Sequence, residues 1–306
     1  MSGRQILVTG VTGQVAESVA VSLAADGSTE VTGLARFSDS AARDRLEAAG
    51  VRCATVDLST GEGFDELPVG VDALLNFAVG KSGRWELDLR VNAEGIGLLM
   101  AAVRPERMLH CSSTGVYNPA GSTVLDESAP LGDNHRAIMP TYSIAKIAAE
   151  EVVRTMCRHL DVPTTIARLN VPYGVGPDGT ARGWPAFHLA MLRAGMPIPV
   201  HSDRPNLFDP IDLDDIAGTV PALLDAASVP STLVNWAGPE QVSLEQWCTL
   251  LGEVCGLDVA LEETDDTIGG VTVDTTKLRE IVGPDRWAGM VGWREGMTRL
   301  ARAGGQ

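Results

Sequence analysis

The sequence predicts an α/β protein: a Rossmann-type, doubly wound parallel sheet with a smaller, mostly helical C-terminal substrate lobe. Three observations lead to this prediction. Short β-branched runs alternate with helical patterns through the first half of the 306 residues, which implies parallel strands with helices on both faces of one sheet. The strand runs are apolar throughout, as expected for burial on both sides. After residue 170, glycine and proline become dense and only short strands separate the helices.

The elements follow in a regular order along the chain. Strands are expected at Gln5–Gly10, Glu30–Ala35, Val51–Val56, Asp72–Phe77, Arg107–Ser113 and Pro163–Asn170. Helices are expected between them at Gly13–Asp26, Ser40–Ala49, Leu87–Val103 and Pro140–Leu160. Later helices are expected at Trp184–Arg193, Asp214–Ala227, Ser243–Cys255 and Thr275–Val282.

Two domains are therefore predicted, a dinucleotide-binding domain over residues 1–170 and a substrate-binding lobe over residues 171–306. The segment LVNWAG, residues 233–238, has the composition of a strand that could return to the main sheet. The boundary between the two domains is therefore approximate.

Composition excludes several classes of protein. The net charge of −16 argues against nucleic-acid and anionic-membrane partners, which favour basic patches. No apolar run approaches the length of a membrane span, and the N-terminus lacks the layout of a signal peptide. Five cysteines without a CxxC pair indicate reduced thiols, so a cytoplasmic location is expected. No histidine or cysteine cluster has metal-ligand spacing, so no metal site is predicted.

The first strand runs directly into the turn VTGVTGQVA. Gly10, Gly13 and Ala16 give a G-x-x-G-x-x-A spacing, in which glycine permits a tight turn and lets a pyrophosphate approach the N–H groups at the helix start. The cofactor-binding candidates of this turn are Gly10, Thr12, Gly13, Gln14 and Val15.

The end of the second strand bears on which nicotinamide cofactor binds. A carboxylate there would accept hydrogen bonds from a ribose 2′-hydroxyl, whereas an arginine would favour a 2′-phosphate. The strand ends at Arg36 with no carboxylate before Asp39, which favours NADP and leaves NAD open. Asp57 and Leu58, after the third strand, are candidates for the adenine edge, although Asp57 could equally cap a turn.

The segment YSIAK places Tyr142 and Lys146 four residues apart on one helix face. A free phenol has a pKa of about 10 and is a poor base at neutral pH, but a neighbouring ammonium stabilises the phenolate. We therefore predict Tyr142 as the proton carrier and Lys146 as its electrostatic partner. Both are also expected to contact the cofactor, Lys146 through the ribose hydroxyls.

The segment CSSTGVY follows a probable sheet strand, whose end faces the cofactor. Ser113 is the candidate hydroxyl for hydrogen bonding to the substrate oxygen, with Ser112 and Thr114 as alternatives if the register differs. Small hydroxyls at such turns also commonly satisfy backbone groups. His110, on the strand, is interpreted as a core residue.

The ordered set of motifs resembles an extended short-chain dehydrogenase/reductase of the NAD-dependent epimerase/dehydratase family over nearly the whole chain. The segments that carry the resemblance are TGVTGQVA, DALLNFAVG, RVNAEGIGLLMAA, CSSTGVY, YSIAK, RLNVPYGVGP, FDPIDLDDIA and LVNWAGPEQVSLEQ.

The resemblance implies roles for further residues. Ser113, Tyr142 and Lys146 match the family's catalytic triad, and Asn92 matches a helix asparagine that supports the lysine through a water. Ala78 matches a position that lines the nucleotide ribose. Asn170 faces the substrate cleft, and Tyr173 in the same segment is a further substrate candidate, although the second lobe around Trp184 and His188 shows no recognisable specificity code. The family also implies a homodimer, formed through a four-helix bundle of the helices at Leu87–Val103 and Pro140–Leu160.

Three departures from the family pattern concern the substrate. Phe208 stands where nucleotide-sugar enzymes carry a diphosphate-binding arginine, with Arg204 only nearby. No basic residue precedes Lys277 in the segment where a second such arginine is expected. The 4,6-dehydratases place Asp-Glu after the catalytic hydroxyl, and this chain has Thr114 and Gly115. An uncompensated diphosphate in a cleft would be costly, so these differences argue against dehydration and favour a smaller, less charged substrate.

Three functions are considered on this basis. The leading hypothesis is an NADP-preferring oxidoreductase that transfers hydride between nicotinamide and a small carbonyl or alcohol, with a sugar-like substrate included. The alternative is an NAD-dependent nucleotide-sugar 4-epimerase that uses the same residues. The third is a cofactor-sensing regulator without catalysis, which the presence of both Tyr142 and Lys146 disfavours.

Overall fold

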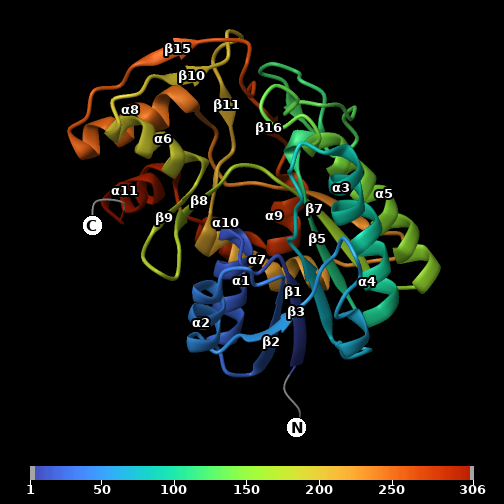
Figure 1. Cartoon of the computed structure of the whole chain (residues 1–306). Helices are drawn as coiled ribbons and strands as arrows, with labels where there is room; N and C mark the ends of the chain where they lie inside the picture. The colour runs from blue at the N-terminus through green and yellow to red at the C-terminus, as the bar shows by residue number, and fades with distance from the viewer. Residues whose placement is uncertain (1–3, 304–306) are drawn as a thin grey trace. The chain divides into compact units, whose positions relative to one another are not determined.

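The computed structural model describes residues 4–303 and contains a seven-stranded parallel sheet in the order β3-β2-β1-β4-β5-β7-β13 (Figure 1). In its centre Ile6 of β1 pairs with Val31 of β2 and with Ala73 of β4. The strands of this sheet are β1 Arg4–Thr9, β2 Thr29–Ala35, β3 Arg52–Thr55, β4 Ala73–Asn76, β5 Met108–Ser113, β7 Thr164–Leu169 and β13 Thr232–Trp236. The prediction of a doubly wound parallel sheet is confirmed, and the LVNWAG segment supplies its edge strand.

Most helices lie where the apolar spacing predicts them. They are α1 Gln14–Ala24, α2 Ser40–Ala48, α3 Trp85–Leu89, α4 Gly95–Val103, α5 Tyr142–Leu160, α6 Trp184–Arg193, α7 Leu213–Asp225, α8 Leu244–Cys255, α9 Thr276–Val282, α10 Pro284–Ala288 and α11 Trp293–Ala303. The predicted long helix at 87–103 is α3 and α4 joined by a π-helical turn at Arg90–Glu94. Helices α10 and α11, after residue 282, are not among the predicted helices.

Short strands make up the remaining regular structure. They are β6 Val124–Leu125, β8 Pro172–Val175, β9 Ala181–Gly183, β10 Ile198–Val200, β11 Leu207–Phe208, β12 Ile211–Asp212, β14 Val242–Ser243, β15 Leu261–Glu263 and β16 Thr272–Val273. They pair as β12-β8-β9, β10-β15, β11-β14 and β16-β6. Single 3₁₀ turns lie at Phe64–Glu66 and Thr114–Val116.

The chain divides into two compact units, neither of which is continuous in sequence. Unit 1 comprises Met1–Ser112, Ile144–Ala167 and Val220–Leu233, and unit 2 comprises Ser113–Ser143, Arg168–Thr219 and Val234–Gln306. The domain boundary at residue 170 stays a prediction.

Unit 1 is a sheet covered on both faces. Figure 1 shows α1 and α2 on one side of β1 and β2, and α4 and α5 on the other side of the sheet. The apolar core on the second side joins Leu7 and Leu74 of the sheet with Ile96 and Leu99 of α4 and Val153 of α5. Burial of such side chains contributes about 1.5–3 kcal/mol each relative to exposure, so this core fixes α5 against the sheet.

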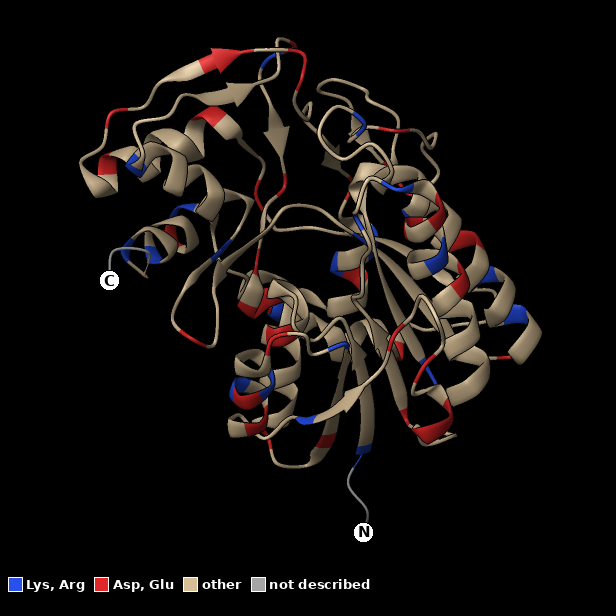
Figure 2. Ribbon diagram, viewed as in Figure 1, with Lys and Arg blue, Asp and Glu red and all other residues tan. Residues whose placement is uncertain are grey.

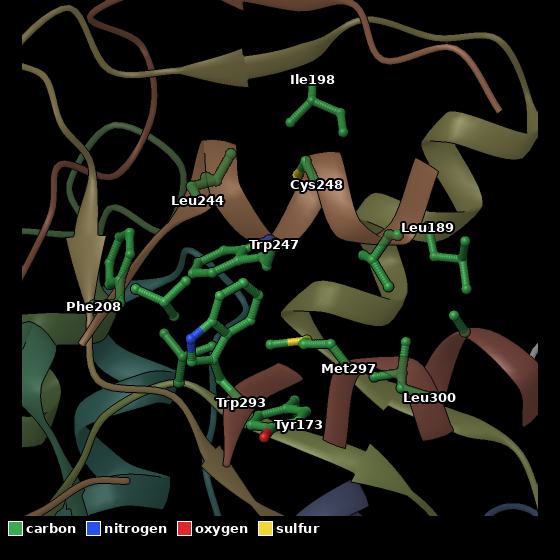
Figure 3. Close-up of a cluster of buried hydrophobic side chains, with 14 of the residues drawn as sticks. Tyr173, Leu189, Ile198, Phe208, Leu244, Trp247, Cys248, Trp293, Met297 and Leu300 are labelled. Carbon is green, nitrogen blue, oxygen red and sulfur yellow. The ribbon is translucent and has the colours of Figure 1, made fainter. Parts of the chain in front are cut away.

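Unit 2 has a separate core built on aromatic residues. Figure 3 shows Trp247 of α8 and Trp293 of α11 among aliphatic side chains from α6 and α11. Tyr173 lies in the same cluster and is fully buried. Helix α8 begins with a capping box, in which Ser243 and Gln246 exchange side-chain and backbone hydrogen bonds.

Charged residues are spread over the helices rather than gathered by sign. Along α5, basic and acidic segments alternate in Figure 2. Among residues 4–303, no helix is long and apolar enough to cross a membrane.

Candidate nucleotide and catalytic site

The turn after β1 has the close approach that the glycine spacing predicts. Gly10 has φ +66°, and its N–H donates to the Leu34 carbonyl oxygen at 2.9 Å. A Cβ at this position would lie 2.7 Å from the Ala78 Cα atom. Gly13 donates its N–H to the Gly10 carbonyl oxygen at 2.8 Å and begins α1. Only glycine combines this left-handed conformation with so near a neighbouring backbone.

A buried hydrogen-bond chain holds this turn at the carboxyl end of the sheet. The Ala78 N–H donates to Thr9 Oγ1 at 3.2 Å, and Thr9 Oγ1 donates to Asn76 Oδ1 at 2.6 Å. The Asn76 amide then donates to His110 Nδ1 at 2.8 Å. Burial, and to a lesser extent the charge of Lys146, keeps the pKa of His110 well below its usual value, so the ring is neutral. His110 is thus a core residue, and Thr9 and Asn76 are supporting residues that sequence reasoning missed.

A cavity of about 360 Å³ opens over this turn within unit 1. The predicted cofactor residues that line it are Gly10, Thr12, Gly13, Arg36, Asp57, Leu58 and Ala78. Gln14 and Val15 lie in the first turn of α1 and are outside the lining. The cavity therefore collects residues from the ends of β1, β2, β3 and β4, the edge where ligands bind in open α/β sheets.

The charges at the cavity are mixed. Arg36 is exposed at the end of β2, and Lys81 lies on the opposite loop. Asp57 Oδ1 accepts from the Ser59 N–H and from Ser59 Oγ, both at 2.7 Å. Burial raises the pKa of Asp57, but the hydrogen bonds from Ser59 and the charge of Arg36 outweigh it, so the net shift is downward. Asp57 therefore caps its turn and also faces the cavity as a carboxylate.

Two buried side chains fix the loop at residues 80–83, which forms one wall of the cavity. Asn92 Oδ1 accepts from the Gly80 N–H, and Asn92 Nδ2 donates to the Gly80 carbonyl oxygen, both at 2.8 Å. Asp88 accepts from the N–H of Ser82 at 2.9 Å and of Gly83 at 3.1 Å. The structure thus gives Asn92 a direct role in the loop, while its water-mediated support of Lys146 stays a prediction. Asp88 was not predicted.

Helix α5 carries a buried lysine that is held in place. Lys146 Nζ donates to the Cys111 carbonyl oxygen of β5 at 2.9 Å, and the side chain is 4% exposed. Burial lowers its pKa, while Cys111 and Glu150 act in the opposite direction. Glu150, one turn further along α5, accepts from Ser112 Oγ at 2.6 Å. Ser112 is therefore engaged with Glu150, and the four-residue period of Tyr142, Lys146 and Glu150 was the signal that could have identified Glu150.

Tyr142 and Ser113 both belong to unit 2. Tyr142 begins α5 and is half-buried, with its ring centroid 5.3 Å from that of His135. Ser113 ends β5, and its Oγ accepts from the Gly115 N–H at 3.0 Å. Thr114 Oγ1 donates to the Leu169 carbonyl oxygen at 3.5 Å. The Ser113 hydroxyl caps its turn and keeps its own proton for donation.

The predicted substrate residues Asn170 and Tyr173 lie inside unit 2. Asn170 Nδ2 donates to the Val271 carbonyl oxygen at 3.0 Å, and its Oδ1 accepts from the N–H of Val171 and of Asp209. Tyr173 is fully buried, and burial raises the pKa of its phenol above the usual range. Both residues organise the interior of the unit, and the structure does not place Tyr173 at a surface from which it could contact a substrate.

The aromatic residues of the second lobe have the same structural role. Trp184, Phe208 and Trp247 contact one another, with centroids 5.3–5.8 Å apart. His188 accepts from Trp247 Nε1 at 3.0 Å, and burial lowers its pKa to about 4. Phe208 is therefore part of this core. Nearby, Arg204 pairs with Glu245 at 3.5 Å.

A second cavity, of about 490 Å³, lies within unit 2. Its ionisable lining residues are Asp133, Arg136, His201, Asp203 and Asp265. Three carboxylates against one guanidinium make this lining unfavourable for a diphosphate. Within residues 4–303, no group of three or more histidine, cysteine and acidic side chains could hold a metal ion, and all five cysteines are free thiols.

Comparison with known proteins identifies the family. The NAD dependent epimerase/dehydratase family matches residues 6–235 of this chain. The chain belongs to this family. It is therefore an enzyme of the extended short-chain dehydrogenase/reductase type, and the resemblance found in the sequence is confirmed.

Two plant proteins are similar to part of this chain. Two trifunctional UDP-glucose 4,6-dehydratase/UDP-4-keto-6-deoxy-D-glucose 3,5-epimerase/UDP-4-keto-L-rhamnose-reductases of Arabidopsis thaliana are 30% identical over 40% of the chain and 27% identical over 63% of it. The aligned parts are only 18% and 28% of those relatives' lengths.

Solved structures of nucleotide-sugar enzymes share the fold of this chain. The UDP-glucuronic acid 4-epimerase of Bacillus cereus, in complex with UDP-glucuronic acid and NAD, has a TM-score of 0.80 at 17% identity and covers 98% of both chains. DesIV, a dTDP-glucose 4,6-dehydratase of Streptomyces venezuelae with NAD bound, has a TM-score of 0.82 at 20% identity, covering 98% of this chain and 96% of that one.

The cavity of unit 1 fits the nicotinamide cofactor of this family. Gly10 lets the turn lie directly against the Ala78 backbone, and Thr12 and Gly13, which precede α1, line the same cavity, where a helix start favours a phosphate group. Arg36 and Lys81 add positive charge to its lining. The coarser prediction, a nicotinamide cofactor, is supported, whereas a preference for NADP stays a prediction.

Proposed function

We propose that this enzyme interconverts a hydroxyl group and a carbonyl group at a sugar carbon of a nucleotide sugar, in the manner of an NAD-dependent 4-epimerase. The observation that carries the proposal is Lys146, buried and fixed to β5, one helical turn after Tyr142. The comparisons support this alternative of the sequence analysis better than its leading hypothesis, because the similar structures are UDP-sugar epimerases and a dTDP-glucose dehydratase.

Each residue has a distinct part in the proposed chemistry. Tyr142 exchanges the proton of the substrate hydroxyl through its phenolic oxygen. Lys146 stabilises the phenolate and binds ribose hydroxyls, and Ser113 donates a hydrogen bond to the same substrate oxygen. A nicotinamide held in the cavity of unit 1 would supply the hydride acceptor and donor for the carbon that carries this oxygen. Gly10, Gly13 and the start of α1 would hold the pyrophosphate of this cofactor.

Dehydration is not part of this proposal. Elimination of water needs an acid–base pair in addition to the phenol, and Thr114 and Gly115 supply no carboxylate after Ser113. A reaction limited to oxidation and re-reduction at one carbon needs only the groups named above.

A second candidate function is an NADPH-dependent reductase of a small carbonyl compound. Arg36 lines the cavity at the end of β2, where a guanidinium favours a 2′-phosphate. Phe208 and the acidic lining of the second cavity add to this candidate, because neither offers a partner for a diphosphate.

The cofactor that accompanies the purified protein distinguishes the two candidates. An epimerase that reoxidises its own cofactor is expected to retain NAD, which heat denaturation would release for chromatographic quantification. It should then interconvert the two 4-epimers of UDP-glucose or UDP-glucuronic acid without added coenzyme. Consumption of added NADPH with a ketone or aldehyde, and no retained NAD, would instead establish the reductase.

The substitution Tyr142→Phe tests the role of the phenol. Loss of the proton carrier should reduce kcat by about 10²–10⁴-fold, while affinity for the coenzyme changes little, as measured by calorimetry. Thr155→Ala, at an exposed site further along α5, is the control. Turnover that survives Tyr142→Phe would contradict the proposed acid–base role, and a preserved biological effect without turnover would favour a cofactor sensor.

A further inference from the structure

Gly115 leaves a space in the segment that follows Ser113, and a histidine ring fills it. A Cβ built on Gly115 would lie 2.3 Å from Cε1 and 2.4 Å from Nδ1 of His135. Real side chains do not approach so closely, so the imidazole occupies the position that any side chain at residue 115 would take. Gly115 and His135 both belong to unit 2.

The same ring contacts the proposed proton carrier. The centroids of His135 and Tyr142 are 5.3 Å apart, with 35° between the ring planes. The loop that carries His135 is tied to the start of α5, because the His135 N–H donates to Ser143 Oγ at 3.3 Å and its carbonyl oxygen accepts from the Met139 N–H at 2.8 Å. The imidazole is therefore held between Gly115 and Tyr142.

One nitrogen of this ring is buried without a partner among the described residues, and that nitrogen is Nδ1. The residue as a whole is only partly buried, and Nε2 is not itself a buried atom without a partner, so Nε2 is the ring nitrogen that a ligand can reach. Burial lowers the pKa of His135 to about 4, so the ring is neutral at physiological pH. An unpaired buried lone pair costs less than an unpaired buried N–H, which assigns the proton to Nε2.

A phenylalanine would fill this position without a buried, unpaired nitrogen. Burying a nitrogen without a hydrogen-bond partner costs about 1–3 kcal/mol of stability. A histidine with such a nitrogen therefore calls for an explanation. A ligand contact through the opposite nitrogen provides one.

We propose that His135 is a substrate-binding residue, whose Nε2–H donates a hydrogen bond to a sugar oxygen beside the hydroxyl that Tyr142 deprotonates. This inference rests on the proposed function, because it assumes a polyhydroxylated substrate at Tyr142. Gly115 is then required so that the imidazole can reach this position.

Three variants of His135 test the proposal. His135→Phe keeps a ring and removes the donor, so the thermal midpoint should be equal to or above that of the wild type, while kcat/KM for the epimerised UDP-sugar falls at least tenfold. His135→Gln retains an N–H donor and should recover part of that loss. His135→Ala removes ring and donor, and should lower both stability and kcat/KM.

Gly115→Ala tests the geometry separately. An added Cβ must displace the imidazole, so this variant should lose activity in the wild-type background and lose little more in the His135→Ala background. The two substitutions should therefore be strongly non-additive. Full activity of His135→Phe, or additive effects of Gly115→Ala and His135→Ala, would overturn the proposal.

The outcome can be separated from failure of the proposed function. If the wild type converts no UDP-sugar, the proposed function fails. The affinity of UDP-glucose, measured by calorimetry on the wild type and His135→Phe, then judges His135 alone. At least tenfold weaker binding to His135→Phe would support the contact, and equal binding or no binding to either protein would overturn it.

Discussion

At the scale of single residues, Gly10 shows how one backbone position serves a binding site. Gly10→Ala is expected to weaken coenzyme affinity at least tenfold and to lower the thermal midpoint, because alanine resists φ +66° and its Cβ would meet the Ala78 backbone. Gly50→Ala is the matched control, since Gly50 has φ +84° and nothing within 4 Å of an added Cβ. Equal effects of the two substitutions would show that backbone strain alone matters.

Asp209 is a second residue whose environment has a measurable consequence. It is 6% exposed, its Oδ2 accepts from the Val273 N–H at 2.8 Å, and burial raises its pKa to about 7 against the smaller effect of that hydrogen bond. The native state therefore keeps a proton that the unfolded chain loses above about pH 4. Stability from this group is fully present below that pH and is lost as pH rises to about 7.

Asp209→Asn should remove this loss. The variant is expected to match the wild type in unfolding free energy near pH 4 and to exceed it at pH 8, by about 4 kcal/mol at most. Chemical denaturation at several pH values would measure the difference, with Asp258→Asn, at an exposed site, as the control. A difference that does not grow between pH 4 and pH 8 would show that Asp209 is ionised in the folded protein.

At the scale of elements, α5 connects the predicted chemistry with the sheet. Its residues at a spacing of four are Tyr142, Lys146 and Glu150, and the last two are tied to β5 through the Cys111 carbonyl oxygen and Ser112 Oγ. The helix is thus fixed to the strand whose last residue is Ser113. A four-residue spacing is common on helices, so the support for a catalytic role comes from these contacts and not from the spacing alone.

The π-helical turn between α3 and α4 has a comparable role at the cavity wall. Asn92→Ala removes both hydrogen bonds to the Gly80 backbone. We expect about tenfold weaker coenzyme binding and faster amide exchange at residues 79–83, measured by hydrogen–deuterium exchange with mass spectrometry. Glu94→Ala, at an exposed site in the same turn, should leave both unchanged. Unaltered exchange in Asn92→Ala would contradict this role.

At the scale of the whole molecule, the predicted homodimer can be tested on helix α4. Leu98 is 52% exposed on this helix, and an exposed apolar side chain there suits a four-helix bundle between two copies. Leu98→Glu is expected to convert a dimer into a monomer, as measured by light scattering after size-exclusion chromatography. Val69→Glu, at a site that is 69% exposed outside the helices, should leave the mass unchanged. A wild-type protein that is monomeric at micromolar concentration would contradict the predicted homodimer.

The sequence alone determined the sheet, most of the helices, the family and the residues at the nucleotide turn. These features depend on local patterns, namely apolar periodicity, glycine spacing and the four-residue interval of Tyr142 and Lys146. The family resemblance also suggested Asn170 and Tyr173 as substrate residues. The structure turns both side chains into the interior of unit 2, and a sequence motif does not say which way a side chain points.

Only the tertiary structure decided which polar groups are already engaged. It assigned Asn92 to Gly80, Ser112 to Glu150 and Asn170 to the backbone of unit 2, and it placed Phe208 and Tyr173 in an aromatic core. It also brought His135 onto Gly115, 20 positions earlier in the chain. Such pairings depend on burial and on contacts between distant segments, because a hydrogen bond formed across the fold leaves no periodic signal in the chain.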